Sequence, residues 1–181
     1  MPASLVLASP AYAKSYVEAL REGFRRGDRP ARKPGEIAKI EADFEAFVAD
    51  MTRQTGDVEL PDGTLIPKVP FDVFFLVDGD VFIGEASVRY RMNDFLLQIG
   101  GHAGYGIRPS FQNRGYGKQI LKLVLERLID RGVERALITC YDHNTASAKV
   151  IEANGGVLEN LIDDPRGGGK SRRYWIDLKN P

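Results

Sequence analysis

Two segments of this chain carry apolar side chains at spacings of three and four, which is typical of a helix with one buried face. The first predicts a helix over 36–52, through Ile37, Ile40, Phe44, Phe47 and Met51. The second predicts a helix from Gly117 to the glycine stop at Gly132, through Ile120, Leu121, Val124, Leu125, Leu128 and Ile129. Asn144, as an N-cap, predicts a further helix that reaches Asn154.

Other segments favour strands, because apolar and β-branched residues are concentrated in short runs bounded by turn residues. Asp78-Gly79-Asp80 separates two such runs and predicts a β-hairpin. The predicted strands cover 4–8, 71–77, 81–90, 102–108, 136–140, 156–162 and 172–178. A helix over 11–22 and two irregular segments, 23–35 and 54–70, complete the pattern.

The predicted elements follow the order strand, two helices, a meander of strands, helix, strand, helix and two strands. This order indicates a mixed α/β (α+β) sheet and not a regular doubly wound fold. No Pro- or Ser-rich linker divides the chain, so we expect residues 1–181 to form a single domain.

Composition narrows the class of protein. The 181 residues are 43% hydrophobic, enough for a buried core, and 25 Lys plus Arg residues balance 25 Asp plus Glu residues. A net charge of zero argues against nucleic acid as a partner. The single cysteine, Cys140, excludes an internal disulfide and a CxxC zinc site. With no signal-peptide pattern and no apolar run near the ~18 residues of a membrane span, we expect a cytoplasmic protein without a membrane partner.

The segment 112–117, Gln-Asn-Arg-Gly-Tyr-Gly, lies in the turn between a predicted strand and a predicted helix. Free N–H groups and a partial positive charge at a helix N-terminus suit a phosphate, and glycines let it approach closely. A P-loop is excluded, because Gln112 and Gln119 stand where that motif requires glycine and Ser or Thr. The dinucleotide fingerprint G-x-G-x-x-G also fails, at its last glycine. The alternative is a plain turn whose glycines serve packing.

The spacing that fits is Gln/Arg-x-x-Gly-x-Gly/Ala between a strand and a helix. GYGIRPSFQNRGYGKQIL resembles the acyl-CoA pyrophosphate loop of the GNAT superfamily of N-acetyltransferases. Downstream, LITCYDHNTASAKVIEANGG resembles the strand, the Asn-capped helix and the Gly-Gly exit that follow in that superfamily. These segments resemble a bacterial-type subgroup of acetyltransferases more closely than the superfamily as a whole. The dense matching covers about residues 100–160.

The resemblance implies the GNAT fold, a mixed and mostly antiparallel central sheet with a splayed parallel strand pair and helices on both faces. It also implies an acyltransferase that moves acetyl from acetyl-CoA, its co-substrate, to a primary amine of a small molecule or peptide. Implied contacts for acetyl-CoA are Ile107, Arg108 and Asn144 for the pantetheine, and Gln112, Asn113, Arg114, Gly115, Tyr116, Gly117 and Lys118 for the pyrophosphate. Asn144 can serve as an N-cap at the same time.

Attack of an amine on a thioester needs a base, a donor for the oxyanion and an acid for the thiolate. His102 is one candidate base, because by alternation it shares a strand face with Gly104 and Gly106. Glu85, with small neighbours in a β-rich segment, is the other. For each, a structural role in the sheet is the alternative. The tyrosine acid of many GNAT members is replaced here by Ile151.

Two function classes stay open, an N-acetyltransferase and a non-catalytic acyl-CoA-binding or sensing module of the same fold. Turnover of an amine separates them. We expect no metal site, because Asp142-His143 has no second histidine at ligand spacing. The loops over 23–35, 52–70 and 91–101 would select the acceptor, which the sequence does not identify. A homodimer is also left open.

Overall fold

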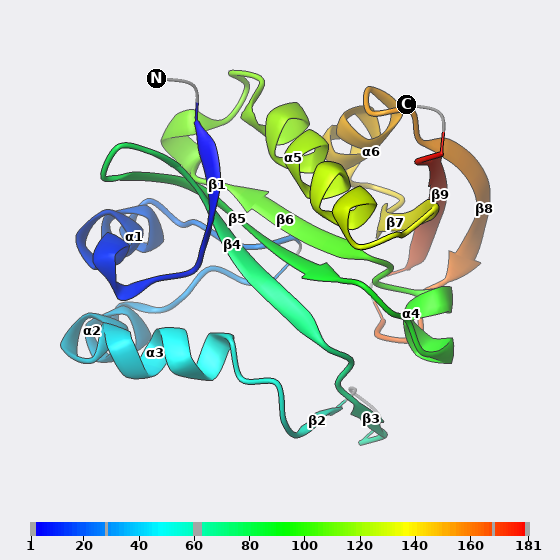
Figure 1. The fold of residues 1–181 in the computed structure, drawn as a ribbon. Helices are drawn as coiled ribbons and strands as arrows, with labels where there is room; N and C mark the ends of the chain where they lie inside the picture. The colour runs from blue at the N-terminus through cyan, green and yellow to red at the C-terminus, as the bar shows by residue number, and fades with distance from the viewer. Residues whose placement is uncertain (1–2, 28, 60–62, 168, 180–181) are drawn as a thin grey trace.

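The computed structural model describes residues 3–27, 29–59, 63–167 and 169–179 (Figure 1). The strands are β1 (Ser4–Leu7), β2 (Asp57–Glu59), β3 (Leu65–Pro67), β4 (Phe71–Asp78), β5 (Val81–Arg89), β6 (Ala103–Ile107), β7 (Arg135–Tyr141), β8 (Val157–Asp163) and β9 (Lys170–Asp177). The helices are α1 (Ala13–Arg21), α2 (Pro34–Ala42), α3 (Phe44–Met51), α4 (Asp94–Gln98), α5 (Tyr116–Asp130) and α6 (Thr145–Glu152). Short 3₁₀ turns occupy Pro10–Tyr12 and Pro109–Phe111. Within the described ranges, none of the helices combines the length and apolar character that a membrane crossing needs.

The strands form two main sheets with the orders β1-β4-β5-β6 and β7-β9-β8, in which all neighbours are antiparallel. The chain passes from β6 through α5 to β7, so the two sheets adjoin at these two strands (Figure 1). β2 and β3 pair antiparallel with each other, apart from the two main sheets. The prediction that 54–70 is irregular is therefore wrong for these two short strands.

Alternation along β4 divides the core between the two faces of the larger sheet. Phe74 and Leu76 belong to a core that includes the buried side chains of α5 and α6, whereas Phe75 and Val77 belong to a core shared with α1, α2 and α3. Figure 1 shows these two groups of helices on opposite sides of the sheet. The ring of Tyr16 in α1 lies 5.2 Å from the ring of Phe75. The predicted fold class, an α/β (α+β) fold with mostly antiparallel strands and helices on both faces, is confirmed.

The single helix predicted over 36–52 is wrong, because Asp43 divides it into α2 and α3. Asp43 leaves the helical conformation, with φ −145° and ψ 74°. Its carboxylate accepts a hydrogen bond from the Ala46 N–H (2.9 Å) and so begins α3. The apolar spacing continues across the break, with Ile40 and Phe44 both buried, and periodicity alone did not reveal it. Aspartate is a favoured N-cap, which is the local signal for the division.

Helix α4 lies in the segment 91–101, which the sequence predicted to be a loop. Asn93 begins this short helix, because its side chain accepts a hydrogen bond from the Leu96 N–H (2.9 Å). The remaining predicted helices and strands agree with the structure to within a few residues at their ends.

Candidate active site

β6 and β7 are joined at one end by a pair of hydrogen bonds. The His102 N–H donates to the Leu137 carbonyl (2.8 Å), and the Leu137 N–H donates to Nδ1 of His102 (2.9 Å). Gly101 allows this close approach, since its φ is +56° and a Cβ on it would lie 2.2 Å from the Leu137 oxygen. We call these three residues the seam. Beyond the seam, β6 and β7 belong to different sheets in the described structure, so the two strands part there.

β6 turns one row of backbone groups toward β5 and the other row away from it. At its end the Arg108 N–H donates to the Ile83 carbonyl (2.8 Å). Because successive residues of an antiparallel strand alternate in direction, the N–H groups of Tyr105 and Ile107 point away from β5, to the side where β7 parts. On this edge the Tyr105 carbonyl accepts a hydrogen bond from the Gly27 N–H (3.0 Å) and the Ile107 carbonyl accepts one from Gln112. The edge therefore offers N–H donors to an extended ligand.

Arg108 does not offer its backbone to this edge, which corrects the prediction that it pairs with the pantetheine. Its N–H is bound to β5, and its carbonyl accepts a hydrogen bond from the Phe111 N–H (2.9 Å). Its side chain lies against α1, where Nε donates to Glu22 (2.8 Å) and Nη1 donates to the Ser15 hydroxyl (3.1 Å). The hydrogen bond from Arg108 lowers the pKa of the Glu22 carboxyl. Arg108 thus holds α1 against the sheet.

The loop between β6 and α5 presents a row of backbone N–H groups at a helix N-terminus. Asn113 (φ 60°) and Gly115 (φ 86°) both adopt the left-handed conformation, which turns the chain sharply before Tyr116 begins α5. In the described part of the chain, the N–H groups of residues 113–117 donate to no other group. Together with the helix dipole, this row suits an anion such as a pyrophosphate.

Side chains beside this loop fix its shape. Nε2 of Gln112 donates to the Ile107 carbonyl (3.0 Å), which ties the loop to the end of β6. The Arg114 guanidinium lies over the ring of Phe111, 5.7 Å from its centre. The Phe111 ring also meets the ring of Tyr116 edge-on at 5.7 Å. These contacts leave the backbone amides on the outside of the turn.

Helix α6 packs closely on the first turn of α5. A Cβ on Gly117 would lie 3.1 Å from Cγ2 of Val150, so a side chain here would press on α6. Nδ2 of Asn154 donates to the Lys118 carbonyl (3.3 Å), while Lys118 itself is exposed and adds a positive charge beside the loop. Helix α6 therefore lies beside the loop over 112–118.

Asn144 caps α6 as predicted, since its side chain accepts a hydrogen bond from the Ser147 N–H (3.0 Å). The Ser147 hydroxyl lies 3.1 Å from the Tyr105 hydroxyl, which joins the start of α6 to β6. Burial raises the pKa of Tyr105, so its hydroxyl keeps its proton at neutral pH. The sequence did not reveal this pair, because only the fold brings the two residues together. Ile151 is fully buried in the core.

His102 forms hydrogen bonds in the seam and lines neither of the two cavities described below. It is 6% exposed, and burial lowers its pKa, with a further contribution from the positive charge of Arg89. Since Nδ1 accepts the hydrogen bond from Leu137, the neutral ring carries its proton on Nε2. Neither nitrogen then offers a lone pair to an amine proton. The geometry favours a structural role over the predicted role as a base.

Glu85 is a buried carboxylate with two strong partners. It is 3% exposed, and its two oxygens accept hydrogen bonds from Nη1 of Arg26 and from the Tyr16 hydroxyl, both at 2.7 Å. Burial, followed by the negative charge of Glu85, raises the pKa of Tyr16 well above its usual value, so this hydroxyl stays a donor. The ion pair with Arg26 offsets part of the cost of burying the carboxylate.

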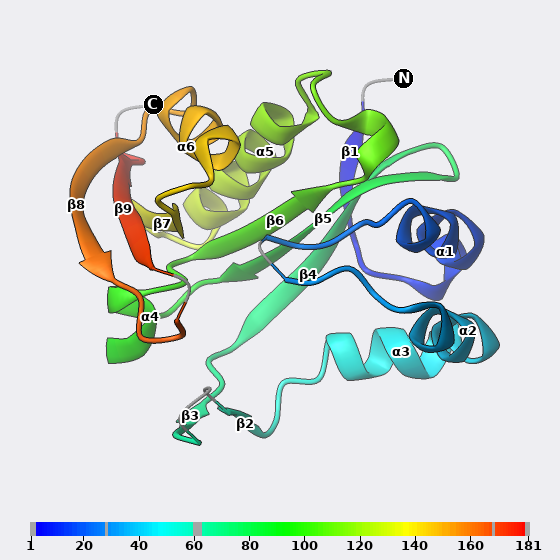
Figure 2. The same ribbon diagram turned by 180° about the vertical axis from the view of Figure 1, so that it is seen from behind.

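Glu85 lines a cavity of about 310 Å³ between β5, α1, α3 and the connection from α1 to α2. Ser87 and Arg89 lie on the same face of β5, since alternate residues share a face, and they line the cavity too. Figure 2 shows the α1–α2 connection running out over β5 and β6. It lies close to β6 because Gly106 has no side chain, and a Cβ there would be 2.3 Å from the Arg25 carbonyl oxygen.

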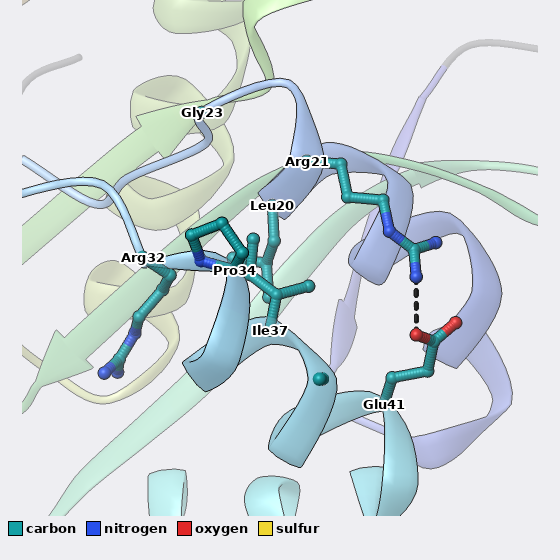
Figure 3. Close-up of a pocket in the computed structure, with 8 residues that line it drawn as sticks. Leu20, Arg21, Gly23, Arg32, Pro34, Ile37 and Glu41 are labelled. Atoms are coloured by element: carbon teal, nitrogen blue, oxygen red, sulfur yellow. Dashed lines mark hydrogen bonds and ion pairs between the residues drawn. The ribbon is translucent and has the colours of Figure 1, made fainter.

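A second cavity of about 300 Å³ lies between α1 and α2, and Figure 3 shows the side chains that line it. Its charged residues include the exposed ion pair of Arg21 and Glu41, and its floor is apolar, with Leu20 and Ile37. None of the lining residues that the structure describes is a buried ionisable group. The cavity that contains Glu85 is therefore the better candidate for chemistry.

A known protein family matches most of the chain. Residues 35–157 match the model of the acetyltransferase (GNAT) domain. A search of curated proteins found no match. The matched residues include Glu85, the seam, the loop over 112–118 and Asn144.

Several solved structures share the fold. RimL, a ribosomal L7/L12 alpha-N-protein acetyltransferase solved with coenzyme A, is 16% identical, with a TM-score of 0.62 over 99% of this chain and 97% of its own. A phosphinothricin acetyltransferase from Sinorhizobium meliloti, solved with acetyl-CoA, is 15% identical, with a TM-score of 0.58 over 98% and 89%. AAC(6')-Ib, solved with ribostamycin and coenzyme A, is 12% identical, with a TM-score of 0.64 over 98% and 94%.

The position of His102 predicts an acid-sensitive stability. Its folded pKa is lowered from 6.5, so the unfolded chain binds the proton first, and the contribution of His102 to stability is full above pH 6.5 and is lost as pH falls below it. Asparagine keeps an acceptor for the Leu137 N–H without titrating. We expect the loss of stability toward low pH to be smaller in His102→Asn than in the wild type.

Urea unfolding midpoints from about pH 5 to pH 8 measure this difference. His143→Asn is the matched control, because His143 is the other histidine of the chain and is exposed. Identical acid dependence in the wild type and His102→Asn would contradict the prediction.

Proposed function

Because this chain belongs to the GNAT acetyltransferase family, we propose that it transfers the acetyl group of acetyl-CoA to a primary amine. The observation that carries the proposal is the row of free N–H groups over 113–117 at the start of α5, next to a strand whose edge has free N–H groups at Tyr105 and Ile107. The CoA pyrophosphate would bind this row, beside the charges of Arg114 and Lys118. The pantetheine would extend along β6 past Ile107 toward Asn144.

In this arrangement the thioester reaches the free edge of β6, near the cavity that contains Glu85. The amine nitrogen attacks the carbonyl carbon, an N–C bond forms, the C–S bond breaks, and CoA leaves as the thiolate. A backbone N–H of Tyr105 or Ile107 would donate to the oxyanion. Glu85 would take the proton of the amine, directly or through a water molecule.

The Tyr105 hydroxyl is our candidate donor for the thiolate. It lies on β6, which the pantetheine would follow, and its hydrogen bond to Ser147 fixes its direction. The hydroxyl is protonated at neutral pH and would stabilise the thiolate by donating a hydrogen bond, whereas its raised pKa disfavours full proton transfer. Tyr105 would take the role for which many GNAT members use a tyrosine at the position of Ile151.

We predict that Gly115→Glu weakens the binding of acetyl-CoA by about 100-fold or more, because like charges brought together cost several kcal/mol. The space around a Cβ at this position is open, so the side chain meets no clash. Gly115→Ala is the control, since both variants strain the same left-handed backbone (φ 86°) and only one adds a charge. Isothermal titration calorimetry measures both affinities.

Equal weakening in the two variants would contradict the role of this loop. If the wild type binds neither acetyl-CoA nor CoA, the proposed function itself is wrong. Binding without thiol release over a panel of amines would instead favour an acyl-CoA-binding module.

We predict that Glu85→Gln lowers kcat by about 100-fold or more while acetyl-CoA still binds, because the amide cannot accept the amine proton. Arg26→Gln is the matched control, since it breaks the same ion pair from the other side and keeps the carboxylate. We expect Arg26→Gln to be the more active of the two in a thiol-release assay. Equal losses would show that Glu85 acts only by holding Arg26.

We predict that Tyr105→Phe lowers kcat by at least about tenfold with little change in KM for acetyl-CoA, because it removes a proton donor and keeps the ring. Tyr90→Phe is the control, since the Tyr90 hydroxyl donates to Asp72 (2.7 Å) and does not line the cavity. A kcat that is the same in Tyr105→Phe and Tyr90→Phe would exclude Tyr105 as the acid.

A further inference from the structure

We propose that the cavity beside Glu85 binds an amine that also carries an anionic group, a carboxylate or a phosphate, and that Arg89 and Ser87 hold this group. The inference rests on the proposed acetyl transfer and names the chemical class of the acceptor. Three independent observations support it: the charge of the cavity wall, the bonding of Arg89, and the buried hydroxyl of Ser87.

The wall of this cavity is strongly positive, although the chain as a whole has no net charge. Among the described residues, its two acids are already paired, Glu85 with Arg26 and Asp50 with Arg53. Its basic side chains are Arg25, Arg26, Arg29, Arg32, Lys68 and Arg89. Arg32 pairs with Glu36 outside the wall (3.0 Å), which leaves Arg25, Arg29, Lys68 and Arg89 without a carboxylate partner among the described residues. This excess of cations suits an anionic ligand.

Arg89 is the cation best placed for specific binding, because it is half-buried and has spare donors. Its Nη1 donates to the Gly101 carbonyl (3.1 Å), and no carboxylate of the described residues pairs with it. Burial, followed by the charges of Arg26 and Arg29, lowers the pKa of Arg89 from 12.5 to about 10, so it is still a cation at neutral pH. A guanidinium has five donors and binds a carboxylate or phosphate with two at once.

Ser87 supplies a second polar contact in the same wall. Its side chain is 3% exposed, and its hydroxyl has no hydrogen-bond partner in the described structure. Buried hydroxyls are nearly always hydrogen-bonded, so an unpaired one that lines a cavity indicates a missing partner. Ser87 lies between Glu85 and Arg89 on one face of β5, where its hydroxyl would donate a hydrogen bond to an oxygen of the anionic group.

The spacing on β5 limits the length of the acceptor. Glu85 and Arg89 are four residues apart on a strand, or about 13 Å between their Cα atoms. The long side chain of Arg89 can shorten this distance, but an α-amino acid, whose amine and carboxylate share one carbon, is too short to reach both. The acceptor therefore carries its anionic group several bonds from the reacting amine.

The test compares 6-aminohexanoate with 6-aminohexanamide, which have the same length and differ in charge at one end. Calorimetry with the CoA-saturated protein measures binding, and thiol release from acetyl-CoA measures turnover. We expect the carboxylate to bind about tenfold more tightly than the amide, as a charge-assisted hydrogen bond would give. 6-Aminohexyl phosphate, in the same assay, shows whether phosphate or carboxylate is preferred.

Arg89→Gln should abolish the preference for the acid over the amide, and Ser87→Ala should reduce it. Ser87→Ala removes a side chain without any hydrogen bond, so it tests the inference even if Arg89→Gln does not fold. Arg91→Gln is the matched control, because Arg91 is exposed and does not line the cavity, and it should keep the preference.

Equal affinity for the acid and the amide, or no binding of either, overturns the inference. So does a preference that survives in both Arg89→Gln and Ser87→Ala. Failure of the proposed function has a different signature, since acetyl-CoA then does not bind or no amine releases thiol. An enzyme that acetylates the acid and the amide equally well would keep the function and lose the inference.

Discussion

The two hydrogen bonds between His102 and Leu137 are the constraint on which the site depends. They hold β6 and β7 together at one end, and the strands part from there. Because they part, the N–H groups on the outer edge of β6 stay available to a ligand. The loop that begins α5 and the cap of α6 lie beside the same edge. A side chain on Gly101 would separate the strands at the seam and remove this arrangement.

The site combines two kinds of recognition. The side proposed for acetyl-CoA consists mainly of backbone N–H groups, in the loop over 113–117 and on the edge of β6, and such groups depend on chain geometry more than on residue type. The side proposed for the acceptor consists of ionisable side chains on β5 and on the connection after α1. Backbone recognition of acetyl-CoA can stay the same in proteins with different sequences. Side-chain recognition of the acceptor distinguishes one substrate from another.

Local signals explain what the sequence predicted well. Hydrophobic periodicity predicted most helices and strands. The glycines predicted the loop before α5, and Asn144 predicted the start of α6. All of these signals come from residues close together in sequence. Features that depend on distant contacts were missed or wrong. The backbone of Arg108 was predicted to pair with the pantetheine, but its N–H binds the Ile83 carbonyl and its side chain binds Glu22, 86 residues away in sequence. Tyr105 meets Ser147 only through the fold. The sequence shows that Glu85, Ser87 and Arg89 alternate along one strand, but it does not show that their shared face points toward α1 and the cavity.

The connection after α1 packs directly against Gly106, so the path of the connection depends on this glycine. The Arg25 carbonyl oxygen occupies the space of a Cβ at position 106, and the Gly27 N–H donates to the Tyr105 carbonyl (3.0 Å). A larger residue at 106 would require a different course for the connection, which also carries Arg26 to Glu85. A change in the path of that connection therefore requires a matching change at position 106. Transferring one of them to another protein without the other would displace the cavity wall that we propose for the acceptor.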